Sequence, residues 1–119
     1  MDKAGELIAV ASSDGIVVNT HFGRAKTFYI YEVTPLEEIR LREKREVSPV
    51  CEGGNHNDER LKETLSKLSD CQYLLVSRIG DGAVTMAESM GIESYEIPGV
   101  ITESVEQLIK YIKIKKLFA

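Results

Sequence analysis

Runs of apolar residues alternate with polar turns along the chain, and their spacing predicts most of its secondary structure. Residues 6–11 are too uniformly apolar for a half-exposed strand, so we expect this strand to lie in the centre of its sheet. A turn at 12–15 and a short extended piece at 16–18 follow. Residues 27–33 alternate aromatic and β-branched side chains, which predicts a second long strand.

Residues 39–47 form a third stretch, in which apolar and charged residues alternate. The period of two places Ile39, Leu41 and Val47 on one face. The other face is basic and carries Arg40, Arg42 and Lys44. A strand this charged is typical of a sheet edge, where charges discourage pairing with other chains. A short helix is the alternative, because Leu, Glu, Lys and Arg also favour helices.

The second half of the chain shows a helical period interrupted by short apolar runs. Leucines at 61, 65 and 68 predict a helix, and Asn57 is a candidate N-cap. Residues 72–77 and 92–97 predict two further strands. Between them, residues 83–90 predict a helix that ends at Gly91.

The last predicted helix begins near Thr102, a candidate cap, and has one apolar stripe. That stripe consists of Val105, Leu108, Ile109 and Ile112. The order is therefore three strands, then helix, strand, helix, strand and helix. The first three strands suit an antiparallel meander, and the second half is a βαβ pattern that requires parallel strands. We expect one α/β domain over residues 1–119, with a mixed five-stranded sheet and about three helices.

Composition limits the classes of partner. The chain has 119 residues, of which 43% are hydrophobic and 29% charged, and its net charge is −4. It therefore has no overall attraction to nucleic acid or to an anionic membrane, and we expect neither as a partner. Two cysteines are too few for a disulfide scaffold, and the N-terminus lacks the apolar core of a secretory signal, so we expect a cytoplasmic protein.

The loop between residues 19 and 25 is the first candidate for a functional site. It contains His21, Gly23 and Arg24, where a plain connection would need only turn residues. The imidazole of His21 can ligate a metal, Gly23 allows close backbone approach, and Arg24 offers five N–H donors. The alternative for His21 is a loop histidine whose ring bonds a backbone carbonyl. Phe22, a large aromatic residue beside a strand, is expected to be a core anchor.

Two further segments carry candidate ligands. Cys51 and His56 form Cys-x4-His on a glycine-rich loop, which is half of a zinc site without a second half. They are either cofactor ligands, zinc ligands or part of an unliganded loop. The turn at Gly80 opens a predicted helix, so its N–H groups are able to hold an anion. Arg78 beside it is either a second cation of the site or a solvated charge, and Cys71 is expected to be a buried thiol.

The segments that contain these residues resemble the dinitrogenase iron-molybdenum cofactor family, which includes NifX, NafY and the C-terminal domain of NifB. The similarity is carried by residues 8–15, 18–25 with its His-Phe-Gly-x-Ala core, 28–33, Cys51, His56, 70–71, 79–80, 91–92 and the terminal helix. The resemblance implies a three-layer, ribonuclease-H-like α/β fold. It also implies binding of an iron-sulfur cluster or an iron-molybdenum cofactor precursor.

Under this resemblance, His21, Cys51 and His56 are candidate metal ligands, and Gly23, Arg24 and Gly80 are further cofactor contacts. The chain lacks the Cys-x3-Cys-x2-Cys triplet of the radical enzyme domain found in NifB, and no nucleophile with its base is visible. We therefore expect a non-enzymatic carrier that exchanges its cofactor with a synthesising or acceptor protein. The alternative is a regulatory module that senses a metal cluster or a small anion in the same pocket.

Overall fold

A mixed sheet of five strands forms the centre of the protein, in a computed structural model that describes residues 5–49 and 58–118. The strands are β1 (Glu6–Ala11), β3 (Thr27–Val33), β4 (Ile39–Glu46), β5 (Tyr73–Val76) and β6 (Glu93–Glu96). Their order in the sheet is β4-β3-β1-β5-β6, so β1 is central and β4 is an edge, as the sequence predicts. β1 and β4 are both antiparallel to β3, while β1, β5 and β6 run parallel to one another.

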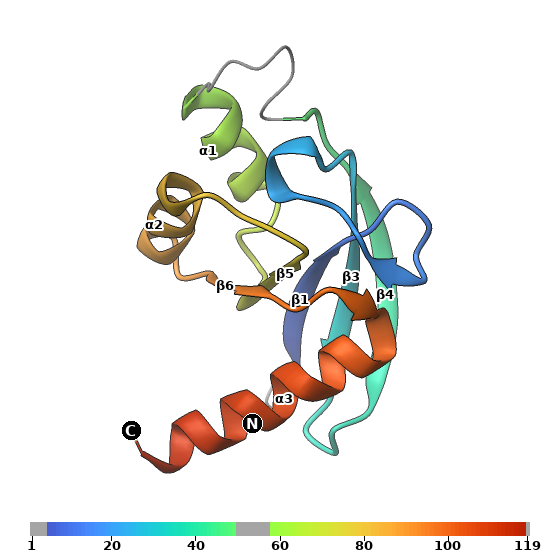
Figure 1. Cartoon of the computed structure of the whole chain (residues 1–119). Helices are drawn as coiled ribbons and strands as arrows, with labels where there is room; N and C mark the ends of the chain where they lie inside the picture. Colours follow the sequence, from blue (N-terminus) through green and yellow to red (C-terminus); the bar gives the residue numbers. More distant parts are fainter. Residues whose placement is uncertain (1–4, 50–57, 119) are drawn as a thin grey trace.

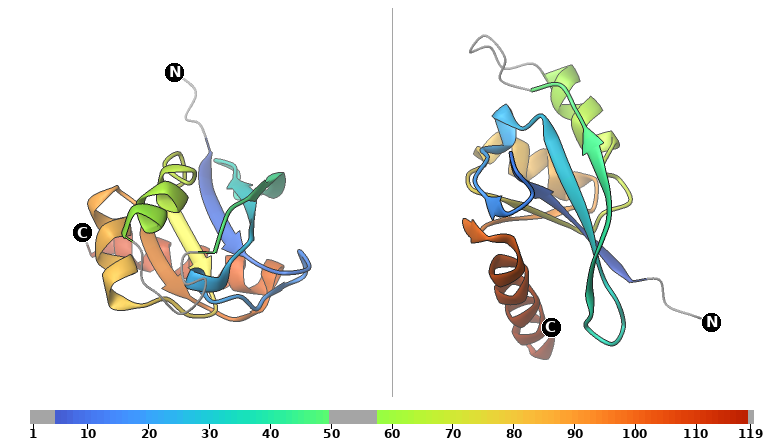
Figure 2. Two further views of the ribbon diagram at one scale, coloured as in Figure 1. Left: turned by 90° about the horizontal axis from the view of Figure 1, so that it is seen from above. Right: turned by 90° about the vertical axis from the view of Figure 1, so that its right-hand side faces the viewer.

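Helices cover both faces of this sheet (Figures 1 and 2). One face packs against α1 (Asp58–Ser66) and α2 (Asp81–Ser89), through Leu61, Leu65 and Ala87. The opposite face packs against α3 (Ile101–Leu117), whose buried side chains are Ile101, Ser104, Val105, Leu108 and Ile112. The alternation of side chains along β1 supplies both cores, because successive residues of a strand point to opposite faces. Within the described residues, the expected mixed sheet and three α-helices are therefore confirmed.

A second, two-stranded sheet was not predicted. It consists of β2 (Val17–Val18) and β7 (Gly99–Val100), which pair antiparallel. The N–H of Ile101 also donates to the carbonyl of Ile16 at 2.8 Å. Strands of two residues are too short to show a period, so the sequence indicates only an extended piece at the first of them.

The prediction that Val47 shares a face with Ile39 and Leu41 is wrong, because β4 contains a bulge. Ile30 pairs with Glu43 whereas Tyr31 pairs with Leu41, which leaves Arg42 as the extra residue. One extra residue reverses the facing of everything beyond it. Ile39 therefore packs on the α3 side and Val47 on the opposite side. Leu41 lies beyond the bulge with Ile39 and keeps its side of the strand, but it is 56% exposed.

Helix ends follow the sequence in one case and depart from it in another. After α2, Gly91 has φ +80°. The N–H of Gly91 donates to the carbonyl of Glu88, and the N–H of Ile92 donates to the carbonyl of Ala87. This glycine terminus confirms the prediction. The predicted cap at Thr102 is wrong, because α3 begins at Ile101, with Val100, two residues before Thr102, at the N-cap and no side-chain cap bond. The candidate cap Asn57 lies outside the described residues.

None of the helices in the described parts of the chain is long and apolar enough to cross a membrane. The ribonuclease-H-like classification and the assignment of residues 1–119 to one domain stay predictions.

Candidate functional site

The loop that carries His21 is held against the segment that follows β5. The N–H of Ser77 donates to the carbonyl of Thr20 at 3.1 Å, and the N–H of Phe22 donates to the carbonyl of Arg78 at 2.8 Å. His21 and Arg78 form an isolated parallel bridge between these bonds. The loop thus meets the chain just beyond the carboxyl end of β5, at the edge where open parallel sheets commonly bind ligands.

A short 3-10 helix, η1 (Phe22–Arg24), sets which side chains of the loop face inward. Phe22 is only 2% exposed, and its ring centroid lies 6.0 Å from that of Phe28. The prediction that Phe22 is a core anchor is therefore confirmed. His21 and Arg24 on either side of this anchor are exposed, and Gly23 is half-buried. The turn thus presents the imidazole and the guanidinium to solvent.

Side chains at the preceding turn fix the other end of the loop. Asp14 Oδ1 accepts the N–H groups of Ile16 at 2.8 Å and Val17 at 3.1 Å, and these bonds hold the pKa of Asp14 below its ordinary value. Asn19 Oδ1 accepts the N–H of Ser13 at 3.0 Å. Because both ends of the loop are anchored, His21 is presented by a defined backbone and needs little ordering on binding.

Gly80 lies at the N-cap of α2, with no side-chain cap bond. A Cβ placed on Gly80 would meet no atom within 4 Å, so the turn is open on this side. One N–H of the turn is already used, because Ile79 donates to Glu96 Oε2 at 2.7 Å. Asp81 also contributes a carboxylate to the first turn. An anion at Gly80 would therefore bind to the remaining N–H groups of α2 beside two acidic side chains.

Sequence reasoning did not single out Glu96. It ends β6, the parallel neighbour of β5, and the carboxyl ends of parallel strands meet at one sheet edge. This rule could have identified Glu96 from the sequence only if the pairing of β6 with β5 had been known beforehand.

The structure brings His21, Gly23 and Arg24 together with Arg78 and the Gly80 turn. Cys51 and His56 lie outside the described residues, so their predicted role as ligands is untested. Within residues 5–49 and 58–118, no group of three or more His, Cys, Asp and Glu is placed to hold a metal ion. The chain's other histidine is His56, so His21 is the single imidazole among the described residues of the site. One imidazole among cations fits a preassembled anionic cluster better than a bare ion, which needs a full set of ligands.

Comparison with known proteins identifies the class. The dinitrogenase iron-molybdenum cofactor family matches residues 6–111, and the chain belongs to this family. It is 41% identical over 105 residues to the FeMo cofactor biosynthesis protein NifB of Frankia alni, covering 86% of this chain and 20% of that protein. It is 34% identical over 104 residues to NifB of Chlorobaculum tepidum, covering 87% and 24%. The chain thus spans about a fifth to a quarter of the length of these relatives.

Two solved structures share the fold. The crystal structure of PH0822 superposes with a TM-score of 0.67 at 21% identity, covering 87% of this chain and 90% of that one. The NMR structure of TM1290 from Thermotoga, a proposed NifB protein of the DUF35 family, gives a TM-score of 0.60 at 20% identity, with 88% of each chain covered.

Proposed function

We propose that this protein is a non-catalytic carrier for an iron-sulfur cluster or an iron-molybdenum cofactor precursor. The family to which the chain belongs supports a role in iron-molybdenum cofactor biosynthesis. The finer proposal is that the loop at His21 binds the cargo and a synthesising or acceptor protein exchanges it. We further propose that the fold is of the ribonuclease-H-like class and that the protein acts in the cytoplasm.

The observation that carries the proposal is the pairing of His21 with Arg78. It sets the exposed residue His21 beside Arg78, an exposed cationic residue, with Arg24 on the adjoining turn. Among the described residues, neither a side chain nor a backbone carbonyl hydrogen bonds to the His21 imidazole, which supports a ring available to a ligand. A ligand role needs a ring nitrogen that no other protein group occupies.

The chemistry of these side chains suits an anionic cluster. An imidazole nitrogen is a ligand for an open iron position, while guanidinium N–H groups donate to sulfide or to an organic acid. The half-buried Gly23 leaves room for backbone approach. Cys51 and His56 remain predicted auxiliary ligands.

A carrier role also fits the small share of NifB that the chain covers. The matched part amounts to 20% of the Frankia protein, so nothing in the match requires this chain to perform the whole protein's chemistry. In the sequence His21 and His56 are the only two histidines, and no serine or cysteine is set in a recognisable nucleophile motif. The proposal therefore assigns bond-making to another protein.

The test is anaerobic loading of the purified protein with a [4Fe–4S] cluster or extracted iron-molybdenum cofactor. We expect a coloured complex, and we expect His21→Ala to weaken it at least about tenfold, ~1.4 kcal/mol. Lys62→Ala, on the exposed surface of α1, is the matched control and should bind as the parent does. Equal binding by His21→Ala and the parent would remove His21 from its role. Failure of cargo to pass to any acceptor, despite tight binding, would favour the regulatory module instead.

A further inference from the structure

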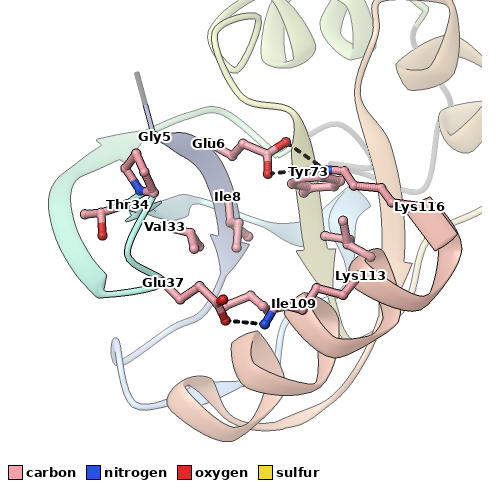
Figure 3. A pocket seen from close by; sticks show the side chains of 12 residues that line it. Gly5, Glu6, Ile8, Val33, Thr34, Glu37, Tyr73, Ile109, Lys113 and Lys116 are labelled. Carbon is pink, nitrogen blue, oxygen red and sulfur yellow. Dashed lines mark hydrogen bonds and ion pairs between the residues drawn. The ribbon is translucent and has the colours of Figure 1, made fainter. Parts of the chain in front are cut away.

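Figure 3 shows a cavity of about 480 Å³. It lies at the opposite end of the sheet from the His21 loop. It is lined by the starts of β1 and β5, the connection from β3 to β4, and the C-terminal half of α3, and is open to solvent on one side. β1 and β5 run parallel from this cavity toward the candidate cofactor site, so the two sites are separated by the length of the strands. The volume lies within the range of small-molecule sites.

The floor of the cavity is apolar. Ile8 and Ile112 are buried there, and Val33 and Ile109 are partly buried and complete the floor. Tyr73, 5% exposed, adds its ring, while its hydroxyl donates to Glu6 Oε2 at 3.1 Å. A short hydrocarbon chain would therefore be removed from water on this floor.

Two ion pairs form the rim, as Figure 3 shows. Lys113 pairs with Glu37, and Lys116 Nζ lies 3.7 Å from Glu6 Oε1. All four side chains are more than 40% exposed, and ion pairs this exposed hold their geometry only weakly. Each ammonium has three donors, so both lysines can accept a further anion without losing their glutamate.

The positions of these charges favour an anionic head group over a cationic one. Lys113 and Lys116 are three residues apart on α3, so they project from one face of the helix and can converge on one carboxylate. Glu6 and Glu37 belong to different elements, β1 and the β3–β4 connection, and Glu6 already accepts the Tyr73 hydroxyl. Two lysines on one face of α3, above an apolar floor, suit an amphipathic anion.

We infer that this cavity is a second binding site, which takes a small carboxylate with a short hydrocarbon tail. The carboxylate lies between Lys113 and Lys116, and the tail lies along Ile8, Val33 and Ile109. The site does not depend on the function proposed for the His21 loop.

The test is a titration of isotope-labelled protein with sodium hexanoate, followed through its backbone amide NMR signals. We expect saturable shifts at Ile8, Tyr73 and Ile109. Lys113→Gln and Lys116→Gln should each weaken binding at least about threefold, and the double variant at least about tenfold. Lys110→Gln is the matched control, because Lys110 lies on the same helix but does not line the cavity, and it should bind as the parent does. The amide spectrum of each variant also reports whether it is folded.

Hexan-1-ol and hexylamine supply the same tail with a neutral or cationic head, and we expect each to bind at least about tenfold more weakly than hexanoate. Equal binding of either compound, the absence of saturation, or undiminished binding by the double lysine variant would overturn the inference. His21→Ala should bind hexanoate normally. A loss of cluster binding in that variant with hexanoate binding intact would show that the two sites bind their ligands independently.

Discussion

The N–H of Phe22 donates to the carbonyl of Arg78 at 2.8 Å, and this bond joins two loops that are far apart in the sequence. Because it uses only backbone atoms, it sets His21 and Arg78 side by side whatever their side chains are. The cations of the site can therefore be removed one at a time without removing the contact that assembles it.

The first prediction concerns those cations. We expect Arg24→Gln and Arg78→Gln each to weaken binding of an anionic cluster by about threefold to tenfold, because each removes a donor and a positive charge. Both side chains are exposed, so the unfolding midpoint should hardly change. Arg40→Gln, on the far edge strand, is the control for net charge. A loss of affinity as large in Arg40→Gln as in Arg78→Gln would mean that only overall charge matters.

The second prediction concerns Gly15, in the turn that anchors the site loop. Its φ is +76°, and an added Cβ would lie 2.9 Å from Cε2 of Tyr29. Gly15→Ala should therefore lower the free energy of unfolding by about 1–3 kcal/mol. Gly82→Ala is the matched control, because a Cβ there meets nothing within 4 Å and the residue lies in α2. Urea unfolding should show Gly82→Ala to be neutral or stabilised; destabilisation of both variants to the same extent would contradict this account.

The third prediction concerns Arg45, which joins β4 to the turn after α1 by a bidentate pair with Asp70. Its Nη1 and Nη2 lie 2.7 and 2.8 Å from the two carboxylate oxygens of Asp70, and Nη1 also donates to the carbonyl of Lys67 at 2.7 Å. Lysine cannot reproduce this fork. At pH 7 we expect Arg45→Lys to cost about 1 kcal/mol of unfolding free energy, a value reduced for the exposure of Asp70.

This difference should depend on pH. The hydrogen bonds from Arg45 hold the pKa of Asp70 below its ordinary value of 3.8 in the folded protein. The pair therefore stabilises the fold fully above pH 3.8, and its contribution is lost as the pH falls through the lower folded-state value. Urea titrations of the parent and Arg45→Lys at pH 7 and at pH 2.5 should show the gap closing in acid. A gap of unchanged size would refute the assignment.

The fourth prediction concerns Cys71, which is 2% exposed and confirms the expectation of a buried thiol. Burial, followed by the charge of Asp70, raises the pKa of Cys71 to about 12. In a Cys51→Ser variant, where Cys71 is the only thiol, iodoacetamide at pH 8 should react at least about a hundredfold more slowly than in 8 M urea. The same rate with and without urea would show that the thiol is accessible.

The sequence by itself determined the elements whose evidence is local. The apolar run of β1 predicts a central strand, the charges of β4 predict an edge, and the leucine spacing of α1 predicts its buried face, because burial leaves its period in neighbouring residues. Phe22 and Gly91 were likewise predictable, since each depends on its own bulk or on its own backbone freedom. The residues of the His21 loop were identified as candidates from their chemical types alone.

Only the tertiary structure decided what depends on partners distant in the chain. The bulge at Arg42 comes from register against β3, and it separates Val47 from the face of Ile39 that the sequence predicted for it. The pairing of His21 with Arg78, the bond of Glu96 to the Gly80 turn, and the lysine-rimmed cavity all depend on which strands lie next to one another. Hydrogen bonds between distant segments leave no periodic pattern in either segment. The sequence therefore identifies candidate side chains, and only the strand order of the sheet shows which of them lie together.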